Sequence, residues 1–185
     1  MQRETMGAAK RHVLITGVPG VGKTTLIRKI ACRLKDCQPV GFYTEEIRID
    51  GIRKGFRLVC LDGREQILSH VSYRGPFAVG RYRVDVAGLE RLLSEMDLCR
   101  STSSLIVIDE IGKMECLSPR FEEVMSALFE SPKIILASIS LKGNGFMRAV
   151  KGRPDCHLVT VTVANRNDLV DPLTGSIRER LRKSR

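Results

Sequence analysis

The clearest chemical signal in the sequence is the run Gly17-Val18-Pro19-Gly20-Val21-Gly22-Lys23-Thr24, which has the spacing G-x-x-x-x-G-K-T. Glycines at these places permit backbone angles that other residues avoid, and they leave room for a ligand. Successive main-chain N–H groups can then converge on one anion. A helix that begins near Lys23 would add the positive end of its dipole at the same point. The run therefore predicts a phosphate-binding loop.

The segments on both sides of this loop have the context that the motif requires. Residues 12–16 form a short apolar run of strand type, and residues 25–34 place apolar side chains on one helical face. In such a strand–loop–helix unit, Lys23 can place its ammonium group on the outer phosphates, and the Thr24 hydroxyl can ligate Mg²⁺. We expect the whole loop and the adjoining Thr25 to bind nucleotide, with Mg²⁺ as the cofactor.

A second landmark is the apolar run at residues 104–108, which ends in Asp109 and Glu110. A continuous apolar run without alternation is typical of a strand that is buried on both faces. After a phosphate loop, an acid at the end of such a strand holds Mg²⁺, and we assign this role to Asp109. Glu110 is the predicted general base; the alternative is that it only orients a neighbouring loop. The predicted nucleotide-binding segment comprises Leu105, Ile106, Val107, Ile108, Asp109, Glu110, Ile111 and Gly112.

Phosphoryl transfer requires cations besides Lys23 and Mg²⁺, because negative charge develops on the transferring group. Lys113 follows Glu110 by three residues, and we include it among the predicted catalytic groups together with Lys23. For any single arginine a solvated surface position is the more common role. The arginines that remain as candidates are Arg81, Arg148 and Arg166.

The segment after the last predicted strand is a usual position for contacts with a base. Asn165 can pair with a base edge and Arg166 can stack on a ring, so both belong to the predicted nucleotide-binding set. The acidic pair Glu45-Glu46 lies in a predicted hairpin. A solvated face is a better interpretation of this pair than a second metal site.

Length and composition favour one globular domain over residues 1–185, with a loose tail at 1–10 and a basic tail at 176–185. No run approaches the roughly 18 apolar residues that cross a bilayer, and the first residues lack a signal-peptide core, so we expect a cytoplasmic protein without a membrane partner. The six cysteines show no zinc-ligand spacing. The net charge of +10 is compatible with a nucleic-acid partner but does not require one.

Strand and helix patterns alternate along most of the chain, which implies an α/β fold with a mostly parallel sheet and right-handed crossovers. Ligands of such sheets bind at the carboxyl ends of the strands, where both landmark motifs fall. Between residues 41 and 71, the Asp50-Gly51 and Asp62-Gly63 pairs separate β-rich runs and indicate antiparallel hairpins. From Ile177 onward the sequence predicts an exposed helix.

Five motifs together carry a family resemblance. They are Gly17–Thr24, Gly41-Phe42-Tyr43-Thr44-Glu45-Glu46, Gly80-x-Tyr82-x-Val84-Asp85, Asp109-Glu110-Ile111-Gly112-Lys113-Met114-Glu115 and Asn165-Arg166-Asn167. The chain resembles the THEP1 nucleoside-triphosphatases over nearly its whole length. The resemblance implies a P-loop NTPase (RecA-like) three-layer sandwich whose mostly parallel sheet is extended by antiparallel strands. It also implies slow, Mg²⁺-dependent hydrolysis of ATP, GTP, CTP, UTP and TTP to diphosphates and phosphate.

Two other functions stay open at this point. A nucleotide or small-molecule kinase would need an acceptor pocket and a closing lid, and the basic segment 142–153 is short for a lid. A nucleic-acid-dependent ATPase would explain the positive charge, but the chain has three tyrosines and no tryptophan for stacking bases. The sequence does not determine the oligomeric state; a monomer is the favoured expectation.

Overall fold

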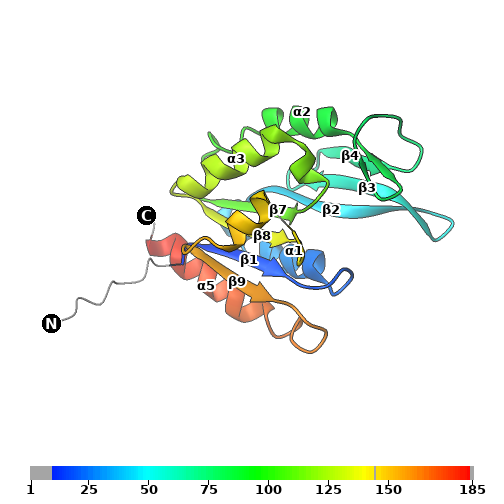
Figure 1. Cartoon of the computed structure of the whole chain (residues 1–185). Helices are drawn as coiled ribbons and strands as arrows, with labels where there is room; N and C mark the ends of the chain where they lie inside the picture. Colours follow the sequence, from blue (N-terminus) through cyan, green and yellow to red (C-terminus); the bar gives the residue numbers. More distant parts are fainter. Residues whose placement is uncertain (1–9, 144, 184–185) are drawn as a thin grey trace.

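The computed structural model describes residues 10–143 and 145–183, and the chain forms a twisted sheet with helices on both faces (Figure 1). Within the described residues the sheet has nine strands in the order β5-β6-β4-β3-β2-β7-β8-β1-β9. The strands are β1 (His12–Thr16), β2 (Val40–Ile49), β3 (Ile52–Cys60), β4 (Glu65–His70), β5 (Ala78–Val79), β6 (Tyr82–Val84), β7 (Leu105–Ile111), β8 (Ile134–Ile139) and β9 (Cys156–Thr160). Residues 1–9 of the predicted N-terminal tail lie outside the described residues.

The helices cover the two faces of the sheet in two groups. They are α1 (Lys23–Arg33), α2 (Val86–Met96), α3 (Pro119–Glu130), α4 (Phe146–Lys151) and α5 (Val170–Lys183), with 3₁₀ turns η1 (Lys35–Cys37) and η2 (Glu115–Leu117). Buried side chains of α1 and α5 form one core on the first face, and those of α2, α3 and α4 form a second core on the other. This arrangement confirms the predicted three-layer α/β sandwich.

The sheet consists of a parallel half and an antiparallel half that meet at β2. Strands β2, β7, β8, β1 and β9 pair in parallel, as expected for the strand–helix alternation. The hairpins after α1 add β3, β4, β6 and β5 in antiparallel pairing. The predicted antiparallel extension is confirmed, and it contributes as many strand pairings as the parallel part does.

Strand β2 joins the two halves through a short parallel seam with β7. Only Val40–Phe42 pair with β7, and the rest of β2 projects beyond the seam. Gly41 lies in this seam with φ of 134°, and a Cβ atom there would collide with the main-chain oxygen of Val107. Glycine at this position therefore allows the close approach of the two strands.

The C-terminal helix differs from the sequence-based expectation. α5 begins at Val170 rather than at Ile177, and it is not an exposed tail. Four apolar residues spaced three or four apart form one buried stripe on the α1 side: Val170, Leu173, Ile177 and Leu181. The basic residues that dominate the composition of residues 176–183 lie around this stripe, and Arg178 forms an ion pair with Asp36 at 2.5 Å.

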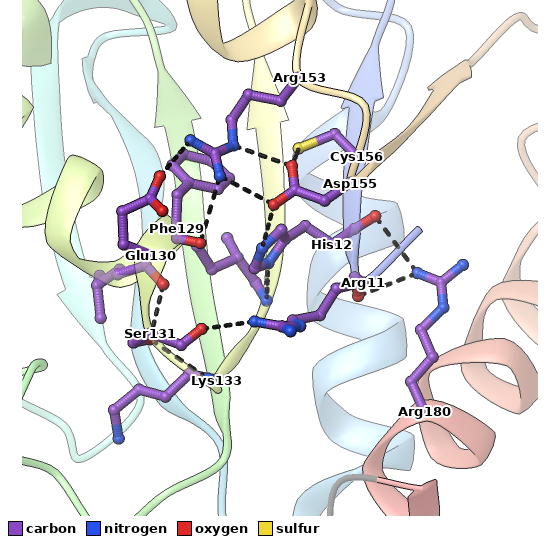
Figure 2. Close-up of polar contacts among 12 residues, drawn as sticks. Arg11, His12, Phe129, Glu130, Ser131, Lys133, Arg153, Asp155, Cys156 and Arg180 are labelled. Carbon is purple, nitrogen blue, oxygen red and sulfur yellow. Dashed lines mark hydrogen bonds and ion pairs between the residues drawn. The ribbon is translucent and has the colours of Figure 1, made fainter. Parts of the chain in front are cut away.

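A polar cluster joins three elements at the end of the sheet opposite the phosphate loop (Figure 2). Arg153 contacts Asp155 at 2.9 Å and Glu130 at 2.8 Å, and thus connects the start of β9 to the end of α3. The fully buried His12 accepts a hydrogen bond from the main-chain amide of Ile135 at Nδ1, and its ring packs edge-on against Phe129. These contacts hold β1 between β8 and β9.

Candidate active site

The predicted phosphate loop connects the end of β1 to the start of α1, as the motif requires. Gly20 and Gly22 have φ angles of 76° and 106°, which L side chains rarely adopt. α1 begins at Lys23. The Lys23 ammonium bends back over the loop, where its Nζ lies 3.1 Å from the main-chain oxygen of Gly17 and 3.4 Å from that of Val18. A polyphosphate can displace these two weak contacts, because an anion is the stronger partner for a lysine.

Asp109 lies at the carboxyl end of β7, with 1% of its surface exposed. Ser138 donates a short hydrogen bond to Oδ1, and the Thr44 amide lies 3.4 Å from Oδ2. Burial raises the pKa of Asp109 above its ordinary value, whereas hydrogen bonds from Ser138, Thr24 and Thr44 favour the charged form. The carboxylate and the Thr24 hydroxyl are oxygen donors of the kind that Mg²⁺ prefers, so these residues fit this cofactor.

Glu110 is half-buried beside the loop, and the Ser140 hydroxyl donates to its Oε1 at 2.7 Å. Behind it lies Glu115, which is 4% exposed and packs against Gly112. Burial, followed by the negative charge of Glu110, raises the pKa of Glu115 to about 8. Burial therefore favours the protonated form of Glu115.

These groups line one cleft of about 730 Å³ between the phosphate loop and the β2–β3 hairpin. The loop forms one wall, and Thr44, Glu46, Arg53 and Phe56 of the hairpin form the other. Eleven predicted site residues line this cleft: Gly17, Val18, Pro19, Gly20, Gly22, Lys23, Thr24, Thr25, Asp109, Glu110 and Lys113. The two landmark motifs thus meet at a single site.

Other residues in the predicted nucleotide-binding set lie elsewhere. Leu105, Ile106, Val107, Ile108 and Ile111 are fully buried within β7, and Val21 is 4% exposed in the core below the loop. None of these six side chains lines the cleft. They support the motifs from behind, because a strand buried on both faces gives its side chains to the two cores. Gly112 lines a neighbouring cavity rather than the cleft.

Asn165 and Arg166 lie beside the loop but outside the cleft. Arg166 lines a smaller pocket of about 270 Å³ with Gly22, Thr25 and Lys29. The Asn165 side chain is used within its own turn: Oδ1 accepts from the Thr162 amide, and Nδ2 donates to the main-chain oxygen of Thr160. The other two candidate arginines line neither pocket: Arg81 donates to the Arg53 main-chain oxygen at 2.7 Å, and Arg148 is exposed on α4.

Sequence reasoning missed the hairpin side of the cleft and the two serines that hold the acids. Ser138 lies at the end of β8 and Ser140 just after it, and β8 is the neighbour of β7. A polar residue at the end of a buried strand is the sequence signal that could have indicated these two serines. Thr44 and Glu46 lie within the Gly41–Glu46 motif, but their role depends on the pairing of β2 with β7. Arg53 gave no signal in the sequence.

A second cavity of about 210 Å³ adjoins the cleft behind Glu110. The two share Thr44, Phe56, Glu110, Lys113 and Ser140 as lining residues. The inner part of the cavity is apolar, with Leu68, Val79 and Met114, and it ends at the buried Glu115.

Comparison with known proteins agrees with this geometry. A family model described as NTPase matches residues 12–174. The nucleoside-triphosphatase THEP1 of Thermotoga sp. strain RQ2 is 41% identical over 167 residues, which cover 90% of this chain and 95% of the relative. The chain belongs to the THEP1 nucleoside-triphosphatase family. It is therefore an enzyme that acts as a nucleoside-triphosphatase, as the resemblance implied.

Two solved structures confirm the THEP1 fold. The crystal structure of THEP1 from Aquifex aeolicus superimposes with a TM-score of 0.79 at 32% identity, covering 88% of this chain and 96% of the other. The solution structure of a human cancer-related nucleoside triphosphatase gives a TM-score of 0.78 at 37% identity, covering 91% and 98%. None of the helices within residues 10–143 and 145–183 is long and apolar enough to cross a bilayer.

Proposed function

We propose that this THEP1 enzyme hydrolyses nucleoside triphosphates to diphosphates and phosphate by in-line attack of water, with Mg²⁺ as cofactor. One observation carries the proposal: Lys23, Thr24, Asp109 and Glu110 line the same cleft. Its volume of about 730 Å³ lies in the range of sites for small molecules. A cleft that combines anion-binding amides, a cation and two acids suits a triphosphate that must be both held and attacked.

The loop and α1 bind the phosphates in this mechanism. Main-chain N–H groups of the loop and the N-terminus of α1 face the β- and γ-phosphates, and Lys23 adds a full positive charge. The Thr24 hydroxyl and the Asp109 carboxylate would hold Mg²⁺. When bound, this ion offsets negative charge on the phosphate oxygens.

Glu110 takes the proton of the attacking water. Ser140 holds Oε1, and Oε2 has no partner among the described residues, so it is available to the water. As the water oxygen forms a bond to the γ-phosphorus, its proton moves to Glu110 and the bond to the bridging oxygen breaks. The bonding electrons leave with the nucleoside diphosphate. Lys113, which lines the same cleft, offsets charge on the transferring group.

The contacts of this site favour broad use of ATP, GTP, CTP, UTP and TTP. The Asn165 amide is already engaged within its own turn, so it is a poor reader of a base edge. Arg166 lies beside Gly22 and can stack on any base, because stacking does not distinguish hydrogen-bond patterns. Affinity then depends mainly on the phosphates, which all five nucleotides share.

Phosphate release from these five nucleotides tests the proposal, with and without Mg²⁺. We expect release with Mg²⁺ and a loss of release when the metal is chelated. Lys23→Ala weakens nucleotide binding and abolishes turnover. Glu110→Gln binds a non-hydrolysable analogue normally but loses about 10²–10⁴-fold in kcat, the usual contribution of a general base.

A matched acid far from the cleft provides the control. Glu123→Gln changes an exposed glutamate on α3, and its kcat should equal that of the wild type. Near-normal turnover of Glu110→Gln would remove Glu110 from the role of base. Full activity in the presence of a chelator would remove Mg²⁺ from the mechanism.

The cavity behind Glu110 favours phosphoryl transfer to a small hydroxyl compound as a second candidate function. It adjoins the same carboxylate and has an apolar interior, as an acceptor pocket would. A transferase keeps the γ-phosphate on an organic acceptor instead of releasing it. Labelled γ-phosphate in the presence of a panel of alcohols distinguishes the two functions, because hydrolysis leaves all of the label in inorganic phosphate.

A further inference from the structure

Arg53 is a cation of the cleft that no sequence motif indicates. Among the described residues that line the cleft, four carry a positive charge: Lys23, Arg53, Lys113 and Lys142. Arg53 is the guanidinium in this set. It lies on β3, in the wall that faces the phosphate loop. A guanidinium differs from an ammonium because its planar set of donors matches two oxygens of a phosphoryl group at once.

Neighbouring side chains hold the Arg53 guanidinium in place. Its Nε donates to the Tyr82 hydroxyl at 3.1 Å, and its Nη1 lies 2.6 Å from Oε1 of Glu46. Tyr82 is itself 9% exposed. Arg81 further holds Tyr82 and Arg53 in place, because it donates to the Tyr82 hydroxyl and to the main-chain oxygen of Arg53. The side chain is therefore positioned before any ligand arrives, which lowers the entropy cost of using it.

Some donors of this guanidinium have no hydrogen-bond partner among the described residues. Arginine carries five N–H donors. The contacts with Tyr82 and Glu46 use two of them, which leaves both N–H groups of Nη2 and one of Nη1 without a partner in the described part of the chain. Free donors on a guanidinium allow arginine to bind phosphate oxygens in pairs.

A β-bulge turns Arg53 toward the cleft. Opposite β2, Phe56 pairs with Glu46 and Arg53 pairs with Arg48, so Lys54 is an extra residue on β3. Without the bulge, alternation would place Arg53 on the face of Arg57, which contacts Glu45 outside the cleft. The extra residue instead places Arg53 on the face of Glu46 and Phe56. Bulges often redirect side chains in this way next to active sites.

We propose that Arg53 stabilises the charge on the transferring phosphoryl group, as an arginine supplied by the chain itself from the β2–β3 hairpin. This inference rests on the proposed hydrolysis. Negative charge spreads over the equatorial oxygens as the bond to the leaving group breaks, and the Nη2 donors of Arg53, which have no hydrogen-bond partner among the described residues, are suited to receive it. Glu46 partly neutralises Arg53 in the free enzyme, so the residue contributes little to ground-state binding and acts mainly on kcat.

The test compares Arg53→Ala with Arg57→Ala. Arg57 lies on the same strand and forms an ion pair with a β2 glutamate at 2.9 Å, but it does not line the cleft. We expect Arg53→Ala to lower kcat by about 10³-fold, the lower range for arginines of this kind, with an unchanged Kd for a non-hydrolysable triphosphate. Arg57→Ala should stay within about twofold of the wild type, since a partly exposed ion pair contributes little.

Two further readouts separate this role from a structural one. Wild type and Arg57→Ala should form a tight complex with a nucleoside diphosphate and aluminium fluoride, which imitates the planar transferring group, and Arg53→Ala should lose it. Arg53→Lys keeps the charge and the aliphatic stem, so it should fold normally, yet it should recover less than a tenth of kcat because it lacks the paired donors.

Failure of this inference and failure of the proposed function give different results. If wild type releases phosphate and Arg53→Ala does so within threefold, the role of Arg53 is refuted while hydrolysis stands. Equal losses in Arg53→Ala and Arg57→Ala would trace the effect to the hairpin and also refute it. If the wild type itself releases no phosphate with Mg²⁺, the proposed hydrolysis fails, and the inference fails with it.

Discussion

The main-chain amide of Thr44 lies 3.4 Å from Oδ2 of Asp109, and the Thr44 hydroxyl donates to the main-chain oxygen of the same residue. Thr44 lies just beyond the last residue pair of the β2–β7 seam, so it extends the attachment of β2 to the end of β7. Through this contact a residue of the β2–β3 hairpin positions the Asp109 carboxylate at the end of β7.

Thr44→Val tests this attachment, because valine keeps the shape and removes the hydroxyl. The main-chain oxygen of Asp109 then loses a partner, and we expect the free energy of unfolding to fall by about 1–2 kcal/mol. The Asp109 carboxylate also becomes less well positioned, so kcat should fall by about tenfold. Thr160→Val, on the exposed part of β9, should change neither quantity. Unaltered kcat in Thr44→Val would show that β2 does not position Asp109.

Glu115→Gln should make the free energy of unfolding of the enzyme less sensitive to alkaline pH. The folded-state pKa of about 8 exceeds the ordinary glutamate value of 4.5, so the folded protein holds this proton more tightly than the unfolded chain does. The stability that this group provides is complete below about pH 4.5 and is lost as pH rises through 8. Glutamine does not titrate. The decrease in the free energy of unfolding between pH 5 and pH 9 should therefore be smaller in Glu115→Gln than in the wild type, by more than ~1 kcal/mol.

Urea unfolding of both proteins at pH 5 and pH 9 measures this difference, with the exposed Glu123→Gln as a control that keeps the wild-type pH dependence. An identical pH dependence in Glu115→Gln and wild type would mean that Glu115 carries no proton in the folded state at neutral pH.

His12→Asn tests the polar cluster in Figure 2 at the acid end of the pH range. Burial lowers the pKa of His12 to about 4, so the unfolded chain binds this proton first as pH falls from 6.5. The stability contributed by neutral His12 is present above pH 6.5 and is lost as pH falls toward 4. Asparagine can still accept from the Ile135 amide, but it does not titrate. Wild type should therefore lose about 2–3 kcal/mol more than His12→Asn between pH 7 and pH 4.5.

Chemical unfolding at the two pH values gives the comparison for His12. The variant is expected to be less stable than wild type at pH 7, because it lacks the ring that packs edge-on against Phe129. The decisive quantity is the change in the free energy of unfolding between the two pH values. If both proteins lose the same stability on acidification, His12 is not the group that titrates.

Ile177→Ala should destabilise the protein by about 2–5 kcal/mol, the usual cost of removing a fully buried isoleucine side chain. Arg182→Ala, on the exposed side of the same helix, should cost less than about 0.5 kcal/mol. Thermal and urea unfolding measure both. Similar small effects would mean that α5 does not pack on α1 in solution.

The parts of this enzyme that the sequence predicted are those whose chemistry is local. The loop at Gly17–Thr24 and the acids at the carboxyl end of β7 are recognisable because neighbouring residues create each function. The hairpin wall depends instead on pairing across the chain, between Phe42 and Ile108 and between Glu46 and Phe56.

Arg53 and α5 show two further reasons for missed features. Arg53 reaches the cleft because of one unpaired residue on β3, and a register shift of this kind leaves no trace in composition or periodicity. In α5, the number of basic residues obscured the buried stripe that includes Ile177 and Leu181. Charge content alone is a poor guide to burial, because a helix with one apolar stripe still packs.

The β2–β3 hairpin is joined to the parallel half of the sheet by the short seam between β2 and β7, which consists of three residue pairs. The far end of the hairpin projects beyond this seam. The phosphate loop, by contrast, connects β1 to α1 in the parallel half of the sheet. Lys23 and Thr24 thus reach the nucleotide from the parallel half, whereas Arg53 reaches it from the hairpin. If Arg53 has the proposed role, exchange of this one side chain alters turnover and leaves the hold on the triphosphate as it is.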